Sequence, residues 1–282
     1  MQTKPFGWTG ERVALIGQGT WHMGDSHGGR AAEVAALRAG LELGMTHIDT
    51  AEMYGSGGAE EAIAEVLRGR SRLQVFLTSK VLPQHASHRG TIAAAEQSLR
   101  RLRTDYLDLY LLHWPGQHPI GETMRAMEEL VAAGKIRFLG VSNFAVAELR
   151  AAMRALTRER IASNQVLYNL ATRGIERDLL PLCEREGIAV VGYTPFGSWP
   201  RAGSDGLRAL HEIGARHGKT ARQVALRFLA RGPALFAIPK ANDPAHVREN
   251  AGAGDFELSA DEIAAIERAF PAPKRRLPLA TA

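Results

Sequence analysis

The sequence predicts an α/β protein whose fold is a (β/α)8 TIM barrel. Short strand-like runs alternate with amphipathic helical segments from about residue 30 to residue 250, without a linker or a second domain between them. The length of 282 residues is close to the roughly 250 residues typical of this barrel. An open doubly wound sheet is the alternative, but Gly17-Gln18-Gly19 lacks the third glycine of the dinucleotide fingerprint. We therefore expect residues 1–282 to form one barrel domain.

Eight strand–helix units are expected in chain order. The first strand is the run 17–21, and the other seven begin near Thr46, Val75, Leu107, Ile136, Asn164, Ile188 and Leu235. The amphipathic segments between them predict helices at 30–43, 60–67, 89–102, 122–133, 145–156, 176–185 and 220–230. Glycines that follow four of these helices are expected to end them in the left-handed conformation: Gly44, Gly134, Gly187 and Gly232.

Two further elements are expected outside the eight units. Residues 13–16, together with the preceding residues 6–10, predict an N-terminal β-hairpin that covers the floor of the barrel. At the other end of the chain, Ser259 and Glu262 have the spacing of a capping box and predict an extra C-terminal helix at 263–270. Pro271 stops that helix, because proline cannot continue it.

Composition indicates a soluble globular protein and excludes several classes of function. The chain has 35 basic and 30 acidic residues, and its short basic run Lys274-Arg275-Arg276 is better explained as a solvated tail than as a nucleic-acid patch. Cys183 is the only cysteine, so no intrachain disulfide forms and a reducing compartment is indicated. No uninterrupted apolar stretch of 18 residues is present. We expect a cytoplasmic monomer that binds neither nucleic acid nor membranes.

Four polar residues stand at or just after the ends of consecutive predicted strands. Asp49, Lys80 and His113 close the second, third and fourth strands, and Tyr54 lies in the loop after Asp49. Because barrel strands are parallel, these side chains meet at the carboxyl rim, where active sites of such barrels lie. A phenol has a pKa of about 10, and a nearby ammonium lowers it. The set therefore predicts a proton-donating site for chemistry at a carbonyl oxygen, with Tyr54 as the acid.

The chain resembles the aldo-keto reductase family over essentially its whole length. The resemblance is carried by ordered motifs: Gly19-Thr20-Trp21, His47-Ile48-Asp49-Thr50-Ala51-Glu52-Met53-Tyr54-Gly55, Thr78-Ser79-Lys80, Leu111-Leu112-His113-Trp114, Gly140-Val141-Ser142-Asn143-Phe144, Asn164-Gln165, Tyr193-Thr194-Pro195-Phe196-Gly197 and Ile238-Pro239-Lys240. The pattern is most similar to short bacterial members that act on small carbonyls of the methylglyoxal type. By resemblance, the catalytic tetrad is Asp49, Tyr54, Lys80 and His113.

The resemblance implies a nicotinamide dinucleotide that lies extended across the barrel mouth. Ser142, Asn143 and Gln165 match positions that bind the carboxamide, and Tyr193 matches the aromatic residue stacked on the nicotinamide ring. The other cofactor-binding positions that it implies are Gly19, Thr20, Trp21, Pro195, Phe196, Gly197, Lys240, Ala241, Asn242, His246, Glu249 and Asn250.

The adenosine end of the expected cofactor site departs from the family pattern. Asp243 and Pro244 predict a helix start, a suitable place for a phosphate, with Lys240 just upstream. However, Ala241 replaces a hydroxyl residue and His246 replaces an arginine that meets adenine and phosphate. Imidazole lacks the permanent charge and the fork of guanidinium. We expect NADP(H) because Lys240 remains, with NAD(H) as the less favoured alternative.

The expected substrate site has apolar walls around Tyr54 and His113. These walls are Trp21, Met53, Leu82 and Trp114, which follow strand ends. The loop after the fourth strand and the C-terminal tail are short, so the pocket is expected to be open, shallow and suited to small aldehydes and activated ketones.

Two other functions and a metal site fit the sequence less well than a reductase does. A redox-sensing or cofactor-sensing regulatory protein would have no need of an intact tetrad. A barrel hydrolase needs two free carboxylates, but Asp49 is committed to Lys80 and leaves Glu52 alone. No metal is expected, because His85 and His88 lie in a loop without a nearby carboxylate. The pair His22 and His27, on either side of Asp25, is a weak metal candidate.

Overall fold

In the computed structural model, eight parallel strands form a barrel in the expected order. The structure describes residues 1–25 and 29–281. The barrel strands are β3 (Gln18–Gly19), β4 (His47–Asp49), β5 (Phe76–Val81), β6 (Leu107–Leu112), β7 (Ile136–Ser142), β8 (Ile161–Leu167), β9 (Ala189–Tyr193) and β10 (Leu235–Ala237). Hydrogen bonds from Gly17 N to Ala237 O at 2.8 Å and from Gly19 N to Pro239 O at 3.0 Å connect the first and last strands. The barrel prediction is confirmed.

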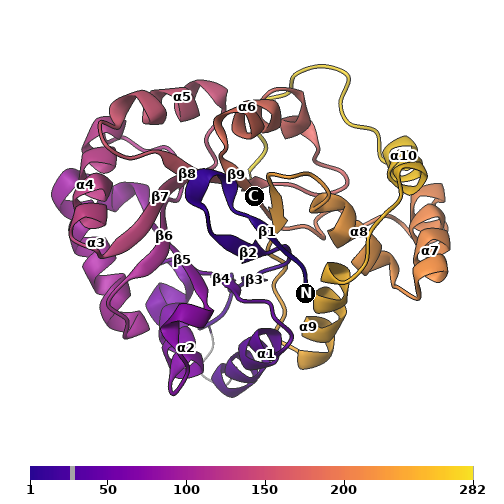
Figure 1. Ribbon diagram of the computed structural model, residues 1–282, viewed down its shortest axis with the longest axis horizontal. Helices are drawn as coiled ribbons and strands as arrows, with labels where there is room; N and C mark the ends of the chain where they lie inside the picture. The colour runs from indigo at the N-terminus through magenta and orange to yellow at the C-terminus, as the bar shows by residue number, and fades with distance from the viewer. Residues whose placement is uncertain (26–28, 282) are drawn as a thin grey trace.

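Helices surround this barrel and form its outer layer (Figure 1). Their bounds are α1 (Arg30–Glu42), α2 (Gly58–Leu67), α3 (His88–Leu102), α4 (Ile120–Ala132), α5 (Val146–Ala155), α6 (Leu179–Glu186), α7 (Asp205–His217), α8 (Ala221–Leu229), α9 (Pro244–Ala251) and α10 (Ala260–Ala269). The large core lies between helices and strands, and a second apolar cluster that includes Leu109, Leu111 and Val191 fills the barrel interior. Along the described residues, no helix combines the length and apolar content needed to cross a lipid bilayer.

The N-terminal hairpin closes the end of the barrel at which the strands begin. It consists of β1 (Thr3–Pro5) and β2 (Arg12–Ala14), joined through the short 3-10 turn Gly7–Thr9, and it crosses the centre of the ring of strands (Figure 1). The Phe6 ring is fully buried and lies 4.9 Å from the Phe76 ring and 5.0 Å from the Phe236 ring. Because this end is filled, a ligand has access from the carboxyl rim.

The capping signals at the two C-terminal helices have the expected geometry. Ser259 Oγ accepts from Glu262 N at 3.2 Å, and Ser259 N donates to Glu262 Oε2 at 2.9 Å, which is the capping box that begins α10. Asp243 Oδ1 accepts from Ala245 N at 2.7 Å and caps α9. This cap fixes where α9 begins, beside the loop that carries Lys240.

Four details differ from the expected elements. Helix α7 was not expected, and strand β8 begins at Ile161 rather than near Asn164. Glu176 and Arg177, expected to begin the helix 176–185, belong instead to a separate 3-10 turn, Gly174–Arg177. Gly44, Gly134 and Gly187 have positive φ as expected, whereas Gly232 does not. The carbonyl of Gly232 instead accepts from Lys4 Nζ at 2.6 Å, so this turn is fastened to the N-terminal hairpin.

Candidate active site

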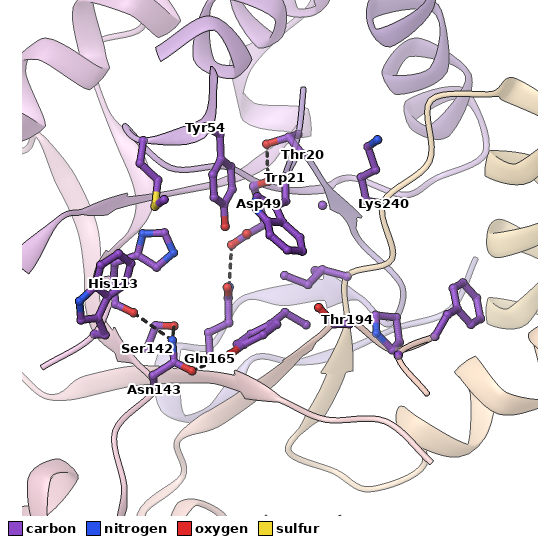
Figure 2. Close-up of a pocket in the computed structure, with 18 residues that line it drawn as sticks. Thr20, Trp21, Asp49, Tyr54, His113, Ser142, Asn143, Gln165, Thr194 and Lys240 are labelled. Carbon is purple, nitrogen blue, oxygen red and sulfur yellow. Dashed lines mark hydrogen bonds between the residues drawn. The ribbon is translucent and has the colours of Figure 1, made fainter. Parts of the chain in front are cut away.

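A cavity of about 530 Å³ opens at the carboxyl rim of the barrel. It extends from Tyr54 and His113 on one side to Lys240 on the other (Figure 2). Its walls come from residues at or after the ends of six strands, from β3 to β9, and from the segment after β10: Gly19, Thr20, Trp21, Asp49, Met53, Tyr54, His113, Trp114, Ser142, Asn143, Gln165, Tyr193, Thr194, Pro195, Phe196, Gly197, Ile238 and Lys240. An elongated ligand with several polar groups fits this distribution of side chains.

A buried ion pair lies directly beneath the phenol of Tyr54. Lys80 Nζ donates to Asp49 Oδ1 at 2.5 Å, and both side chains are almost inaccessible, at 0% and 2% exposed. The same ammonium donates to Thr50 O at 2.9 Å and to Tyr54 Oη at 3.3 Å. All three acceptors together satisfy the charge that Lys80 carries into the barrel. The structure therefore brings together the phenol, ammonium and carboxylate that the strand ends predicted.

A tight turn after β4 aims the Tyr54 side chain at Lys80. The 3-10 turn Tyr54–Gly57 contains Gly55 with φ of 55°, a left-handed conformation that costs little only for glycine. A Cβ at Gly55 would lie 2.6 Å from the carbonyl carbon of Gly24, so no larger residue fits without a shift of the backbone. The sequence Tyr54-Gly55 thus sets the position of the phenol through backbone geometry.

The electrostatics of the pair keep the ammonium charged and the phenol protonated. Burial alone lowers the pKa of Lys80, but the charges of Asp49 and Tyr54 and the hydrogen bonds to both raise it above the ordinary 10.5. Burial raises the pKa of Tyr54 above 10, because it outweighs the lowering that Lys80 exerts. The prediction that the pKa of Tyr54 is lowered was wrong. Lys80 moderates the effect of burial and does not reverse it.

His113 follows β6 and faces the phenol across the cavity. The two rings are edge to face, with centroids 5.8 Å apart. Burial, and then the nearby charge of Lys80, lower the pKa of His113 to about 2, so its imidazole is neutral at physiological pH. Within the part of the chain that the structure describes, its buried Nδ1 has no hydrogen-bond partner. A neutral imidazole carries one N–H donor, which suits an oxygen acceptor in the cavity.

Amide and hydroxyl side chains lie at the carboxyl ends of β7, β8 and β9. Asn143 Nδ2 donates to His113 O at 3.2 Å and to Ser142 Oγ at 3.3 Å, and Tyr193 Oη donates to Asn143 Oδ1 at 2.8 Å. Gln165 Nε2 donates to Asp49 Oδ2 at 2.7 Å across the barrel (Figure 2). The sequence did not predict this last bond, which connects Gln165 to the ion pair of Asp49 and Lys80. Amides and hydroxyls both donate and accept, which fits a carboxamide substituent.

The residues expected to hold the cofactor fall into two groups. Those from the barrel rim line the cavity: Gly19, Thr20, Trp21, Ser142, Asn143, Gln165, Tyr193, Pro195, Phe196, Gly197 and Lys240. Those of the adenosine end lie outside its lining: Ala241, Asn242, His246, Glu249 and Asn250. Thr220 Oγ1 donates to the carboxylate of Glu249 at 2.8 Å, which places the start of α8 against α9. The roles of both groups in binding stay predictions.

The expected substrate walls mostly line the same cavity. Trp21 and Met53 are 47% and 40% exposed, so these two walls are largely open to solvent. Trp114 also lines the cavity, with its ring 4.7 Å from that of His113. Leu82 does not line it. Its backbone N donates to Glu52 Oε1 at 2.6 Å instead, which holds the segment after β5 against the Tyr54 loop.

The structure corrects one argument about metal sites. His85 Nδ1 lies 3.0 Å from Glu52 Oε1, and His88 Nε2 lies 2.9 Å from Glu129 Oε1, so both histidines have a nearby carboxylate. His27 lies outside the described residues, and His22 Nδ1 lies 2.8 Å from Asp25 Oδ2. Within residues 1–25 and 29–281, no three such side chains gather to hold a metal ion.

Fold and site together define a (β/α)8-barrel protein with an acid–base site at its carboxyl rim. The model of the Aldo/keto reductase family matches residues 15–270. The chain belongs to the aldo/keto reductase family.

Relatives of known identity resemble the chain over its full length. Methylglyoxal reductase YeaE of Escherichia coli (strain K12) is 47% identical over 282 residues, which cover 99% of each chain. The crystal structure of an aldo-keto reductase from Klebsiella pneumoniae in complex with NADPH has a TM-score of 0.92 at 47% identity, and covers 100% of this chain and 99% of that one. An aldo/keto reductase from the same organism, in complex with NADP and acetate, has a TM-score of 0.90 at 45% identity, and covers 100% of both chains.

Proposed function

We propose that the protein is an NADPH-dependent oxidoreductase that reduces small aldehydes, activated ketones and dicarbonyls of the methylglyoxal type to alcohols. The observation that carries this proposal is the contact between Tyr54 Oη and Lys80 Nζ, 3.3 Å long, at the inner wall of the cavity. A protonated phenol held by a buried ammonium can donate its proton to an oxygen that is gaining negative charge. Reduction of a carbonyl generates such an oxygen.

The residues around the cavity fit a nicotinamide dinucleotide. Ser142, Asn143 and Gln165 would hold its carboxamide, the ring of Tyr193 would lie against the nicotinamide, and Lys240 would meet phosphate at the outer end. When bound in reduced form, this group supplies a hydride to the substrate carbon. Support for NADPH comes from the relatives crystallised with NADPH and with NADP. NADH is less favoured, because Lys240 offers a charge to the 2′-phosphate that only NADPH carries.

The tetrad divides the proton chemistry among its members. Tyr54 gives its phenolic proton to the substrate oxygen as that oxygen gains charge. Lys80 stabilises the phenolate that remains, and Asp49 keeps the ammonium charged and pointed at it. His113, which is neutral, would donate a hydrogen bond to the same substrate oxygen and fix its orientation. The hydroxyl of the alcohol thus receives its proton from this chain.

Support for small substrates comes from the open walls of the cavity. Trp21 and Met53 are partly exposed, so little of a bulky ligand would be enclosed there. Selection would then rest on carbonyl reactivity and small size. The name of the relative YeaE, a methylglyoxal reductase, agrees with this substrate class.

A spectrophotometric panel tests the proposal. Methylglyoxal, phenylglyoxal and simple aldehydes are each supplied with NADPH and, in parallel, with NADH, while the absorbance of the reduced nicotinamide is followed. The proposal expects turnover with dicarbonyls and a higher kcat/KM with NADPH. Absence of turnover with every carbonyl, despite nucleotide binding, would instead favour a cofactor-sensing regulatory protein. Efficient reduction of a steroid would contradict the open pocket.

We also propose that the chain acts as a single-domain monomer in the cytoplasm, without nucleic acid as a partner. The single barrel with continuous strand order supports one domain, and the lone, buried Cys183 supports a reducing compartment. Light scattering of the purified protein tests the monomer, and a dimer mass would contradict it.

A further inference from the structure

An arginine outside the cavity lining is held over two aromatic rings at the outer end of the site. The guanidinium carbon of Arg222 lies 4.8 Å from the ring centroid of Phe196 and 5.0 Å from that of Trp199. The two rings are themselves edge to face, with centroids 5.8 Å apart. A guanidinium over aromatic faces is attracted to both, so its position is restricted although it is exposed.

The packing places this arginine against the wall of the cavity. Phe196 lines the cavity and packs against the same apolar cluster as Ala241, the residue that follows Lys240. That cluster includes Leu226, which lies one turn after Arg222 on the same face of α8. Arg222 therefore stacks on Phe196, a residue of the cavity wall, and Lys240 lines the same cavity.

The charge of Arg222 is not neutralised by the protein. Among the described residues, no carboxylate oxygen lies within ion-pair distance of its guanidinium. Neighbouring arginines differ in this respect, since Arg208 pairs with Asp205 and Arg216 pairs with Glu262. A permanent cation that is positioned by aromatic rings and lacks an anionic partner is prepared to bind an anion.

We propose that Arg222 binds a phosphate of the dinucleotide, with Phe196 and Trp199 holding its guanidinium in place. This inference rests on the proposed function, because it assumes a dinucleotide in the cavity. It accounts for the departures at the adenosine end, where Ala241 and His246 offer no permanent charge. The diphosphate and the 2′-phosphate are both anions that a guanidinium can bind. NADPH and NADH distinguish them, because both carry the diphosphate and only NADPH carries the 2′-phosphate.

Calorimetric titration of the purified full chain with NADPH and with NADH tests the proposal. Arg222→Ala is expected to weaken binding by about tenfold, the size of one charge-assisted hydrogen bond at a partly exposed site. Arg222→Lys keeps the charge but loses the planar stacking, so its affinity for the nucleotide should lie between those of the wild type and Arg222→Ala. The loss should shrink at high ionic strength, because salt screens exposed charges.

Arg208→Ala is the matched control, because it removes the same charge from an exposed helical arginine that already has a carboxylate partner. It should bind both nucleotides like the wild type. Loss of affinity for both nucleotides in Arg222→Ala identifies the diphosphate as the ligand, and loss for NADPH alone identifies the 2′-phosphate. Unchanged affinity for both, in a wild type that binds and turns over, overturns the role of Arg222 and leaves the proposed function intact. A wild type that binds neither nucleotide overturns both.

Discussion

Replacing Lys80 with methionine separates the structural and chemical roles of the buried ion pair. The substitution keeps an unbranched side chain of similar length but removes the ammonium that contacts Asp49, Thr50 and Tyr54. Two consequences follow from the geometry. Asp49 becomes a buried carboxylate without its cation, and Tyr54 loses the group that stabilises its phenolate.

The expected loss of stability comes from the uncompensated carboxylate. Asp49 is 2% exposed and would keep one hydrogen bond, from Gln165 Nε2 at 2.7 Å. Removal of one partner of a buried ion pair typically costs about 3–5 kcal/mol. For a chain of this size, such a loss lowers Tm by roughly 10 °C. The loss of a donor that stabilises transition-state charge in a dry site should lower kcat by about 10²–10³-fold.

The double variant Asp49→Asn with Lys80→Met distinguishes the two effects. It contains no buried charge at this position, so differential scanning calorimetry should show that most of the lost Tm is recovered. Its kcat with methylglyoxal and NADPH should stay as low as that of Lys80→Met, because the phenol still lacks its ammonium. A double variant that regains kcat close to the wild-type value would refute the assignment of Lys80 to phenolate stabilisation.

Two further predictions concern His113 and the Tyr54 turn. Because burial and Lys80 hold the pKa of His113 at about 2, kcat/KM for reduction should show no titration near 6.5, and a limb there that His113→Gln abolishes would contradict the neutral imidazole. Gly55→Ala should lower both Tm and kcat, because the new Cβ combines positive φ with an approach of 2.6 Å to Gly24 C. The control is Gly69→Ala, at a position with φ of 77° and open space around it. Its folding stability should fall only by the cost of the left-handed conformation, about 1–2 kcal/mol, and its kcat should be unchanged. Equal effects of the two substitutions on kcat would show that the Tyr54 turn does not position the phenol.

The positions of Asp49, Lys80 and His113 could be predicted because they depend on topology alone. Once the strands are parallel and consecutive, Asp49 and Lys80 must share one rim, and the register places Asp49 beside Thr78, two residues before Lys80. Nothing in that inference requires knowledge of side-chain packing. The contact between Gln165 and Asp49 was missed because it crosses the barrel between β4 and β8. Only the closed shape of the barrel brings these strands face to face.

Helix α7 shows where local patterns are insufficient. Its sequence contains Gly206 and Gly214, which weaken helix propensity, and no strand separates it from α8. Tertiary packing explains both glycines: a Cβ at Gly206 would lie 2.6 Å from the Phe270 ring, and one at Gly214 would lie 2.3 Å from Lys219 O. The close approach of Phe270 and Lys219 to these positions leaves no room for a larger residue, and the sequence alone does not reveal it.

The pKa of Tyr54 was predicted in the wrong direction for a related reason. The sequence shows that a lysine and an aspartate are near the phenol, and a nearby lysine lowers the pKa of a phenol. It does not show how deeply the phenol is buried. In the folded protein burial outweighs the ammonium, so the pKa of the phenol is raised and the phenol stays protonated.

The kcat of Tyr54→Phe is the measurement that tests the acid assignment most directly. Phenylalanine keeps the ring next to His113, and Lys80 keeps its bonds to Asp49 and Thr50, so folding and NADPH affinity should be unchanged. The kcat for methylglyoxal reduction should fall by about 10²–10⁴-fold, because that is the contribution of a general acid. Retention of more than about a tenth of the wild-type kcat, with normal NADPH binding, would mean that the proton comes from another group.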